Sequence, residues 1–344
     1  IDELLKKLDV SVALLTGSSS VKKRREIHES LENGNLNILI GTHALLEDKV
    51  KFDNLGIAII DEQHRFGVAQ RSKMWQKNTL PPHILVMTAT PIPRTLAMSV
   101  YGDLDISVID ELPPGRKEVK TVHRNDNNRL AVFKFMKQEI EKGRQVYVVY
   151  PLIQESQAMD YKDLMDGYES ISREFPVPKY QISIVHGKMK ATDKEYEMQR
   201  FVKGQTQIMV ATTVIEVGVN VPNASIMVIE SSERFGLSQL HQLRGRVGRG
   251  ADQSYCVLLS SFKLSTEAKT RLKTMVETSD GFKIAEVDLK LRGPGNMMGT
   301  QQSGVLNLKI ADVVKDTPIL YRARNSAIEI LQEDPNLSQI KNNI

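Results

Sequence analysis

Cysteine, tryptophan and long apolar runs are almost absent from this sequence of 344 residues. Its single cysteine, Cys256, excludes an intramolecular disulfide and any zinc site built from cysteines, and its apolar neighbours predict a core position. No stretch approaches the roughly 18 consecutive apolar residues of a membrane span. The first residues also lack the charged and then apolar pattern of a signal peptide. These absences predict a cytoplasmic protein and leave little scope for redox chemistry.

The length and composition indicate a folded protein of more than one domain. Hydrophobic residues make up 41% of the chain and charged residues 26%, and 344 residues exceed what one core usually organises. The net charge of +4 suits a polyanionic partner but is equally ordinary for an enzyme. Because the chain starts at Ile1 and enters an apolar run at Val10, we expect that an upstream part of the protein is missing.

Short runs rich in Val, Ile and Leu recur along the chain, with room for a helix between successive runs. This alternation predicts an α/β fold with largely parallel sheets. The runs are almost continuously apolar, as expected for strands that helices cover on both faces. They occupy residues 10–15, 37–40, 57–60, 84–87, 146–150, 182–185, 208–210, 226–229 and 255–259.

The clearest interruption of this pattern is the Pro-Pro-Gly sequence at 113–115. After residue 262, helical segments replace the strand-like runs. The predicted boundaries are a first domain at 1–112, a linker at 113–118, a second domain at 119–262 and a helical region at 263–344.

Two carboxylates, Asp61 and Glu62, directly follow the apolar run at 57–60. Ligands of parallel sheets bind beyond the carboxyl ends of the strands. Phosphoryl transfer to water needs one carboxylate to hold Mg²⁺ and another to orient or deprotonate the water. We therefore assign Asp61 to the metal and Glu62 to the water. Taken alone, such a pair is more often a helix-capping Asp beside a solvated Glu.

The second half of the chain contains a loop rich in glycine and arginine after Gln242. Its glycines let the backbone approach a ligand, and Arg246 and Arg249 offer planar guanidinium groups for a phosphate in the transition state. A basic loop that contacts the phosphate backbone of a nucleic acid is an equally good interpretation of this segment alone.

Three motifs follow one another on successive α/β units: Asp-Glu-Gln-His at 61–64, Thr-Ala-Thr-Pro at 88–91 and Gln-x-x-Gly-Arg-x-Gly-Arg at 242–249. Together they resemble motifs II, III and VI of superfamily 2 helicases, and residues 186–189 and 211–218 are similar to motifs IV and V. The resemblance implies two RecA-like parallel-sheet domains, the first incomplete, followed by a small helical hairpin and a C-terminal helix. It also implies ATP and Mg²⁺ as cofactors.

The resemblance further implies roles for individual residues. Closure of a cleft between the domains would bring Arg246 and Arg249 onto the γ-phosphate, and Thr88 and Thr90 would transmit hydrolysis to the DNA side. The resemblance also implies that Gln242 is a catalytic residue, together with Asp61, Glu62, Arg246 and Arg249. The implied ATP-binding residues are Asp61, Glu62, His64, Gly218, Arg246 and Arg249, and the implied DNA-binding residues are Thr42, His43, Thr212 and Thr213.

Longer stretches, at 61–67, 88–95, 112–116 and 233–242, are similar to the RecG family of bacterial branch-migration helicases. This resemblance implies a monomeric motor that acts on forks and Holliday junctions of double-stranded DNA in recombination and repair. It also implies a hairpin and loop that couple ATP turnover to translocation, with Arg271, Arg292 and Gln302 as the coupling residues. The motor of a transcription-repair coupling factor is the nearest alternative.

The chain contains no Gly-x-x-x-x-Gly-Lys-Ser/Thr sequence, which would supply a phosphate-binding loop. The family places that loop, and an oligonucleotide-binding wedge domain, upstream of the residue that corresponds to Ile1. We therefore expect residues 1–344 to be inactive alone. A non-catalytic DNA-binding fragment is the second interpretation of the chain as it stands.

Overall fold

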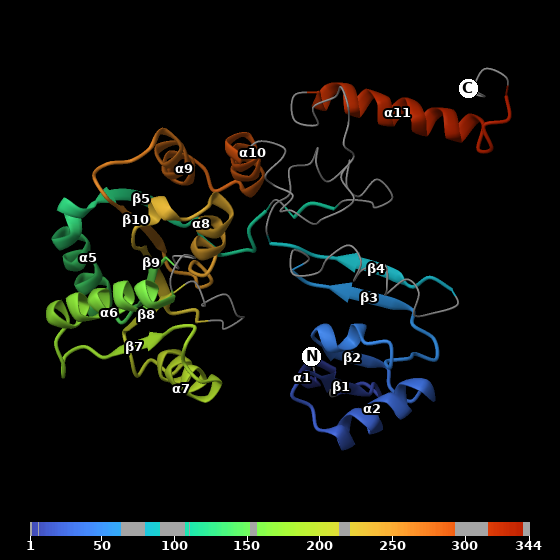
Figure 1. The fold of residues 1–344 in the computed structure, drawn as a ribbon, viewed down its shortest axis with the longest axis horizontal. Helices are drawn as coiled ribbons and strands as arrows, with labels where there is room; N and C mark the ends of the chain where they lie inside the picture. Colours follow the sequence, from blue (N-terminus) through green and yellow to red (C-terminus); the bar gives the residue numbers. More distant parts are fainter. Residues whose placement is uncertain are drawn as a thin grey trace. The chain divides into compact units, whose positions relative to one another are not determined.

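The computed structural model describes residues 2–5, 7–62, 80–89, 107–109, 111–151, 157–212, 221–292 and 316–339. The contacts of these residues divide them into two units. The described residues up to Ala89 form the first unit, and those from residue 107 onward form the second. Figure 1 labels the helices and strands of both units.

The first unit contains two pairs of short parallel strands. Its small core consists of Leu15, Ile27, Leu31, Ala44 and Val50. The Ser20 hydroxyl accepts a hydrogen bond from the Lys23 N–H and so caps the first long helix. The elements are α1 (Asp2–Leu5), β1 (Val12–Leu15), α2 (Val21–Glu32), β2 (Ile38–Gly41), η1 (His43–Leu46), β3 (Ile57–Ile60) and β4 (His83–Val86).

The second unit is built on a six-stranded parallel sheet in the order β5-β10-β9-β6-β8-β7. Its strands are β5 (Lys120–Asn125), β6 (Gln145–Tyr150), β7 (Ile182–Val185), β8 (Ile208–Thr212), β9 (Ala224–Ile229) and β10 (Tyr255–Ser260). Its helices are η3 (Asp126–Asn128), α5 (Arg129–Glu141), α6 (Gln157–Glu174), α7 (Ala191–Val202), η4 (Ser232–Arg234), α8 (Leu237–Arg244), α9 (Thr266–Glu277), α10 (Gly281–Arg292) and α11 (Thr317–Glu333).

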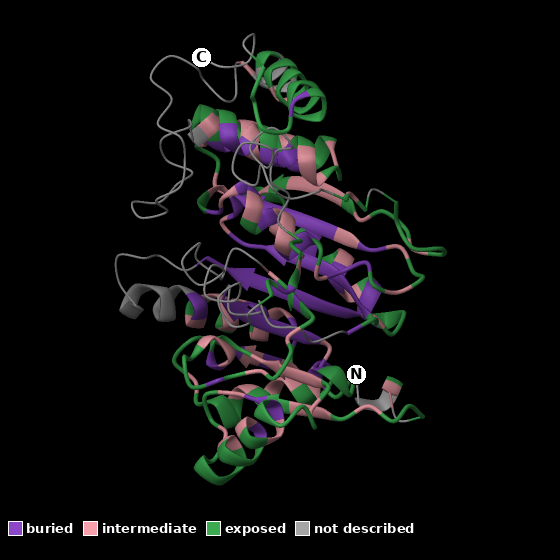
Figure 2. Cartoon of the chain, turned by 90° about the vertical axis from the view of Figure 1, so that its right-hand side faces the viewer, coloured by how far each residue is buried: buried purple, intermediate pink, exposed green. Residues whose placement is uncertain are grey.

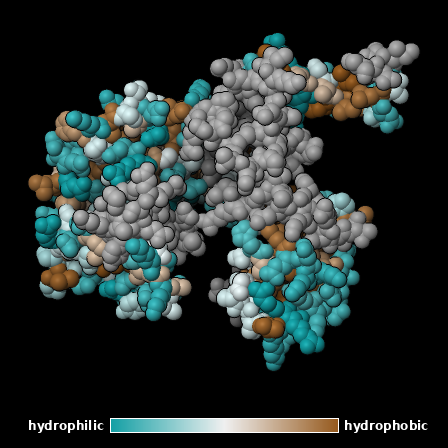
Figure 3. All heavy atoms as spheres, in the orientation of Figure 1, coloured by the Kyte–Doolittle hydropathy of each residue, from teal (hydrophilic) through white to brown (hydrophobic). Residues whose placement is uncertain are grey.

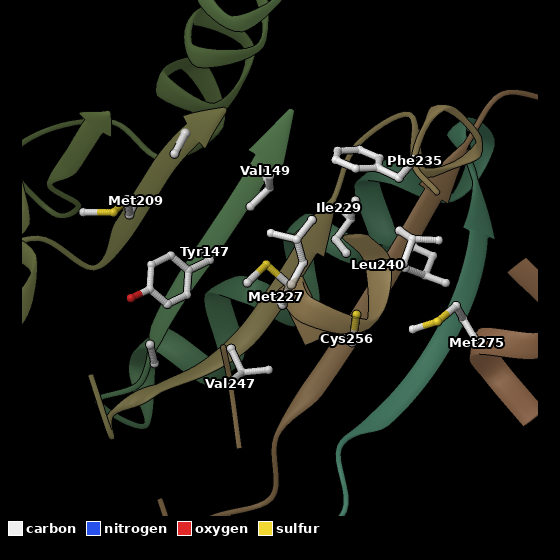
Figure 4. Close-up of a cluster of buried hydrophobic side chains, with 14 of the residues drawn as sticks. Tyr147, Val149, Met209, Met227, Ile229, Phe235, Leu240, Val247, Cys256 and Met275 are labelled. Carbon is white, nitrogen blue, oxygen red and sulfur yellow. The ribbon is translucent and has the colours of Figure 1, made fainter. Parts of the chain in front are cut away.

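Alternate residues of the central strands serve two separate cores, because successive side chains of a strand point to opposite faces. Tyr147 and Val149 of β6 lie in one cluster, which α8, α9 and α10 complete (Figure 4). Val146 and Val148 lie in the other cluster, which α5 and α6 complete. The sheet is therefore covered on both faces, and its central strands are buried throughout (Figure 2).

The apolar runs predicted the strands to within about two residues at each end. The predicted α/β class and the core position of Cys256 are confirmed. Strand β5, whose residues Lys-Thr-Val-His-Arg-Asn are mostly polar, was not predicted from the sequence. Among the described strands it lies at the edge of the sheet and pairs with β10 alone, so it has less apolar surface to bury than the central strands.

In the view of Figure 3, the part of the second unit that contains the six-stranded sheet has a mainly hydrophilic surface with scattered apolar residues, whereas apolar residues gather over α11. Exposed apolar side chains of this unit include Leu130 and Val177. Single exposed apolar residues are ordinary in folded proteins. Among the helices that the structure describes, none combines the length and the apolar character needed to cross a membrane.

A buried ion pair joins the start of α5 to the end of β9. The guanidinium of Arg129 donates to both carboxylate oxygens of Glu230, at 2.6 and 2.8 Å, and Glu230 is 3% exposed. Burial is the largest single influence on the pKa of Arg129 and would lower it, but the contacts with Glu230 and Asp126 together outweigh burial and raise it. The pair thus fixes α5 against the sheet through two charge-assisted hydrogen bonds.

Replacing Arg129 with Met should lower the free energy of unfolding by about 3–5 kcal/mol, because it leaves the Glu230 carboxylate buried and unpaired. Chemical denaturation measures this loss. Lys273→Met is the matched control, since it breaks an exposed ion pair with Glu277 in the same unit and should cost under about 1 kcal/mol. Equal losses of unfolding free energy in the two variants would contradict the conclusion that burial makes the Arg129–Glu230 pair more important than an exposed pair.

Candidate functional site

The two carboxylates of the first unit lie at the carboxyl end of β3, beside the end of β4. The two strands pair with Ile60 opposite Val86, and the Met87 N–H donates to the Ile60 carbonyl at 2.8 Å. Asp61 and Thr88 therefore lie at the same edge of this pair, and both are exposed. The parallel register brings together three predicted site residues, Asp61, Glu62 and Thr88.

Glu62 adopts a left-handed backbone conformation with φ of 52°. This conformation is uncommon for a residue other than glycine. The Asp61 carboxylate supports it by accepting a hydrogen bond from the Glu62 N–H at 2.8 Å. Strained conformations of this kind cluster at functional sites, where the surroundings hold a side chain in a required direction.

The predicted DNA contacts of the first unit lie at the corresponding edge of the β1–β2 pair. Thr42 and His43 follow β2 and are exposed, and the Thr42 carbonyl begins η1 by accepting from the Leu45 N–H. The neighbouring loop after β1 is shaped by Arg24, which donates to the carbonyls of Thr16, Gly17 and Ser19. These contacts make Arg24 part of the loop's architecture rather than a solvated side chain.

Gln242 and the two arginines of the second unit follow one another around the end of α8. This helix buries Leu237, Leu240 and Leu243, and residues 245–250 form the loop that follows it, called the finger loop below. Arg246 is half-buried and Arg249 is exposed. Burial raises the pKa of Tyr147 in β6 to about 12, and the nearby charges of Arg249 and Arg246 act in the opposite direction. The charges of both arginines therefore act on the side chain of Tyr147.

Arg244, the last residue of α8, is a buried cation that binds the C-terminal end of α9. Its guanidinium donates to the carbonyls of Met275 and Thr278 at 2.9 Å and of Ser279 at 3.3 Å. It also contacts Nδ1 of His241 at 3.1 Å. The last carbonyls of a helix have no intrahelical partner, so Arg244 satisfies groups that α9 would otherwise leave without one.

Three further predicted residues lie in the second unit outside α8 and the finger loop. Thr212 ends β8 next to Tyr150 of β6 and is buried, and its hydroxyl has no hydrogen-bond partner within the part of the chain that is described. Arg271 of α9 donates to the Glu233 carbonyl at 2.8 Å and thereby joins α9 to η4. Arg292 is the last residue of α10, and its side chain lies outside the described part.

Five predicted site residues cannot be placed: His64, Thr90, Thr213, Gly218 and Gln302 lie outside the described residues. Within the described ranges, no group of three or more His, Cys, Asp or Glu side chains could hold a metal ion.

Three family profiles match successive parts of the chain. They are the DEAD/DEAH box helicase at residues 1–99, the helicase conserved C-terminal domain at 129–251, and ATP-dependent DNA helicase RecG, domain 3, C-terminal, at 278–344. The chain is 50% identical to the ATP-dependent DNA helicase RecG of Synechocystis sp. over 96% of its length, and 50% identical to that of Aquifex aeolicus over 98%. The chain belongs to the RecG family.

Solved structures agree with this assignment. A structure of RecG bound to a three-way DNA junction is 44% identical, with a TM-score of 0.69 over 93% of the chain. The helicase MrfA is 18% identical with a TM-score of 0.58, which supports the RecA-like helicase fold alone. The chain spans 39% and 43% of the two RecG relatives above and 41% of the solved RecG chain.

Membership of the RecG family decides between the two motor families that the sequence motifs left open. Arg244 was not predicted as a site residue, although it lies within the motif at 242–249. The spacing of Leu237, Leu240 and Leu243 defines the buried face of α8, and Arg244 adjoins that face. An arginine beside the apolar face of a helix was the feature of the sequence that could have predicted a buried, hydrogen-bonded Arg244.

His241 gives the contact between α8 and α9 a pH dependence. Burial, and then the Arg244 charge, lower the pKa of His241 to about 4. Since the unfolded value is about 6.5, the folded state binds fewer protons than the unfolded state between these values, and stability falls as the pH drops through that window. We expect a loss of about 2–3 kcal/mol between about pH 7 and pH 4 from this group.

Denaturation of wild type and His241→Asn at several pH values tests this expectation. Asparagine can place an acceptor oxygen near the position of Nδ1 but does not titrate, so the variant should lose less stability on acidification. Other histidines contribute equally to both proteins and cancel in the comparison. Parallel pH profiles would contradict the assigned role of His241.

Proposed function

We propose that the protein containing this chain is an ATP-dependent DNA helicase or translocase that acts on branched double-stranded DNA. The observation that carries the proposal is the shared edge of β3 and β4, where Asp61, Glu62 and Thr88 lie together. It is supported by 50% identity to proteins named ATP-dependent DNA helicase RecG.

Each residue of this proposal has a chemical role. Glu62 orients or deprotonates the water that attacks the γ-phosphate, and its left-handed backbone sets the direction of its carboxylate. Arg246 and Arg249 stabilise charge that develops on the transferred phosphoryl group. Gln242, next to Leu243 on α8, belongs to the same catalytic set. His64 and Gly218 complete the proposed nucleotide-binding residues.

The residues at the end of β3 fit a bound Mg²⁺. This ion usually keeps several waters and takes one or two carboxylates together with phosphate oxygens, so it does not need a larger protein cluster. Asp61 is exposed and offers such a carboxylate. Bound there, Mg²⁺ would neutralise charge on the β- and γ-phosphates.

The proposed DNA partner is a replication fork or Holliday junction, which the motor would regress or migrate during recombination and repair. The solved relative with 44% identity was captured on a three-way DNA junction. Thr42, His43, Thr212 and Thr213 are the proposed DNA contacts, and Thr88, Thr90, Arg271, Arg292 and Gln302 the proposed coupling residues. We further propose that the protein acts as a monomer and that the domain boundaries lie at 112, 118 and 262.

Residues 1–344 contain no Gly-x-x-x-x-Gly-Lys-Ser/Thr sequence. We therefore propose that these residues alone hydrolyse ATP slowly or not at all, and that the full-length protein is the active form. A DNA-binding fragment without catalysis is the second candidate for residues 1–344, and comparison of this chain with the full-length protein separates the two.

Replacing Glu62 with Gln in the full-length protein should lower DNA-stimulated ATP hydrolysis by about 100-fold or more, because the amide cannot accept the proton of the attacking water. Phosphate release from Mg-ATP, with and without forked DNA, measures this. Glu32→Gln is the matched control, since Glu32 is an exposed carboxylate at the end of α2 in the same unit. Wild-type turnover in Glu62→Gln would remove Glu62 from catalysis.

DNA affinity should depend steeply on salt and little on sequence, because the proposed contacts reach phosphates rather than bases. If the protein neutralises six or more phosphates, we expect affinity for a forked DNA to fall by about 1,000-fold or more between about 50 and 200 mM salt. Fluorescence anisotropy with forks of two unrelated sequences measures both properties. A strong preference for one sequence would contradict this mode of binding.

A further inference from the structure

The finger loop is held from outside by a residue of the predicted linker, 132 positions earlier in the chain. Nε of Arg116 donates to the carbonyl of Gly248 at 2.6 Å, and the contact is partly buried. A cationic donor gives a stronger hydrogen bond than a neutral one. The Gly248 carbonyl belongs to the peptide bond that leads into Arg249, so this bond fixes the orientation of that peptide plane.

The linker is shaped so that Arg116 reaches this carbonyl. The Arg116 N–H donates to the Pro113 carbonyl at 3.1 Å, and Gly115 has φ of 81°. Proline at the second position and a glycine of positive φ at the third are the residues that a type II turn requires. The Pro-Pro-Gly-Arg sequence thus builds a tight turn that ends at the residue making the contact.

A second contact shows close packing at the same point. Gly248 has φ of 79°, and a Cβ atom placed on it would lie 2.7 Å from Cγ2 of Val119. Any side chain at position 248 would therefore collide with the segment that follows the linker. Arg116 in the linker and Val119 just after it thus meet the loop at a position that only glycine fits.

Glu118, between Arg116 and Val119, makes further contacts with the rest of the second unit. Nε2 of Gln253 donates to the Glu118 carbonyl at 2.7 Å, and the Ser279 hydroxyl donates to the Glu118 carboxylate at 3.2 Å. Arg116, Glu118 and Val119 thus contact both the region of the finger loop and the turn between α9 and α10. From Arg116 onward, the chain is fixed to the second unit.

We propose that Arg116 is a positioning residue for the finger loop: by holding the Gly248 carbonyl, it sets the direction in which Arg249 leaves the loop. The inference rests on the proposed function, because it assigns Arg116 to the placement of an arginine that acts on ATP. A purely structural role would make Arg116 a contributor to stability with no specific effect on turnover.

The test compares Arg116→Ala, Arg116→Lys, Arg249→Ala and the Arg116→Ala/Arg249→Ala double variant in the full-length protein. DNA-stimulated ATP hydrolysis gives kcat and KM, and thermal unfolding gives Tm. Arg124→Ala is the matched control, because Arg124 is an exposed arginine of the same unit whose side chain donates to the adjacent His123 carbonyl.

We expect Arg116→Ala to lower kcat by about 10-fold to 100-fold, as misplacement of a catalytic group does. The KM for ATP and the Tm should change little, and Arg116→Lys should recover part of the loss. The double variant should be no slower than Arg249→Ala, because Arg116 acts only through the loop. Wild-type kcat in Arg116→Ala, or losses that multiply in the double variant, would overturn the inference.

Hydrogen exchange gives a readout that does not depend on turnover. Peptides that cover residues 246–250 should exchange faster in Arg116→Ala than in wild type or Arg124→Ala, and unchanged exchange would overturn the inference. Its failure is distinct from failure of the proposed function. If Glu62→Gln is inactive while Arg116→Ala is normal, only the inference fails; if wild type shows no DNA-stimulated hydrolysis, both fail.

Discussion

The second unit depends on a buried cation whose partners, within the described part of the chain, are backbone carbonyls and a histidine ring and not a carboxylate. Arg244 is 5% exposed, and its guanidinium is satisfied by backbone carbonyls at the end of α9 and by the ring of His241. The C-terminus of a helix carries partial negative charge, so this is a favourable place for a cation. The contact joins α8 and α9 rigidly, and it requires His241 to stay neutral, because a protonated ring would place N–H against the guanidinium.

This contact also fixes the point from which the finger loop begins. Arg244 ends α8, and Gly248 is held four residues later by Arg116 and Val119. Arg246 therefore lies between two fixed positions. Arg244 is bound to the end of α9, and Gly248 is bound to Arg116 and packs against Val119. A short loop with both ends fixed loses little further conformational entropy when a ligand orders it, which favours its use as a preorganised site.

Much of the fold could be predicted from the sequence, because the central strands are visible as continuous apolar runs. β6, β8 and β9 are buried on both faces, so every position favours an apolar residue. The edge strand β5 lacks that constraint and was missed. The gathering of Asp61 and Thr88 at one edge was also predictable, since parallel strands end on the same side. The left-handed backbone of Glu62 was not, because no residue type marks it there.

The missed site residues, Arg116 and Arg244, share a physical property: both donate to backbone carbonyls. Every residue has a backbone carbonyl, so the sequence does not show which carbonyl accepts the hydrogen bond. From the sequence alone, such an arginine is recognised only as a positive charge. Resemblance to family motifs does not identify such arginines either, because the motifs assign roles to side chains that contact the ligand. What the sequence does preserve is the geometry around the contact, in Gly115 and Gly248, whose positive φ values mark where the backbone must turn or approach closely. In this chain the glycine preceding Arg249 is the acceptor of a donor 132 positions away in the sequence.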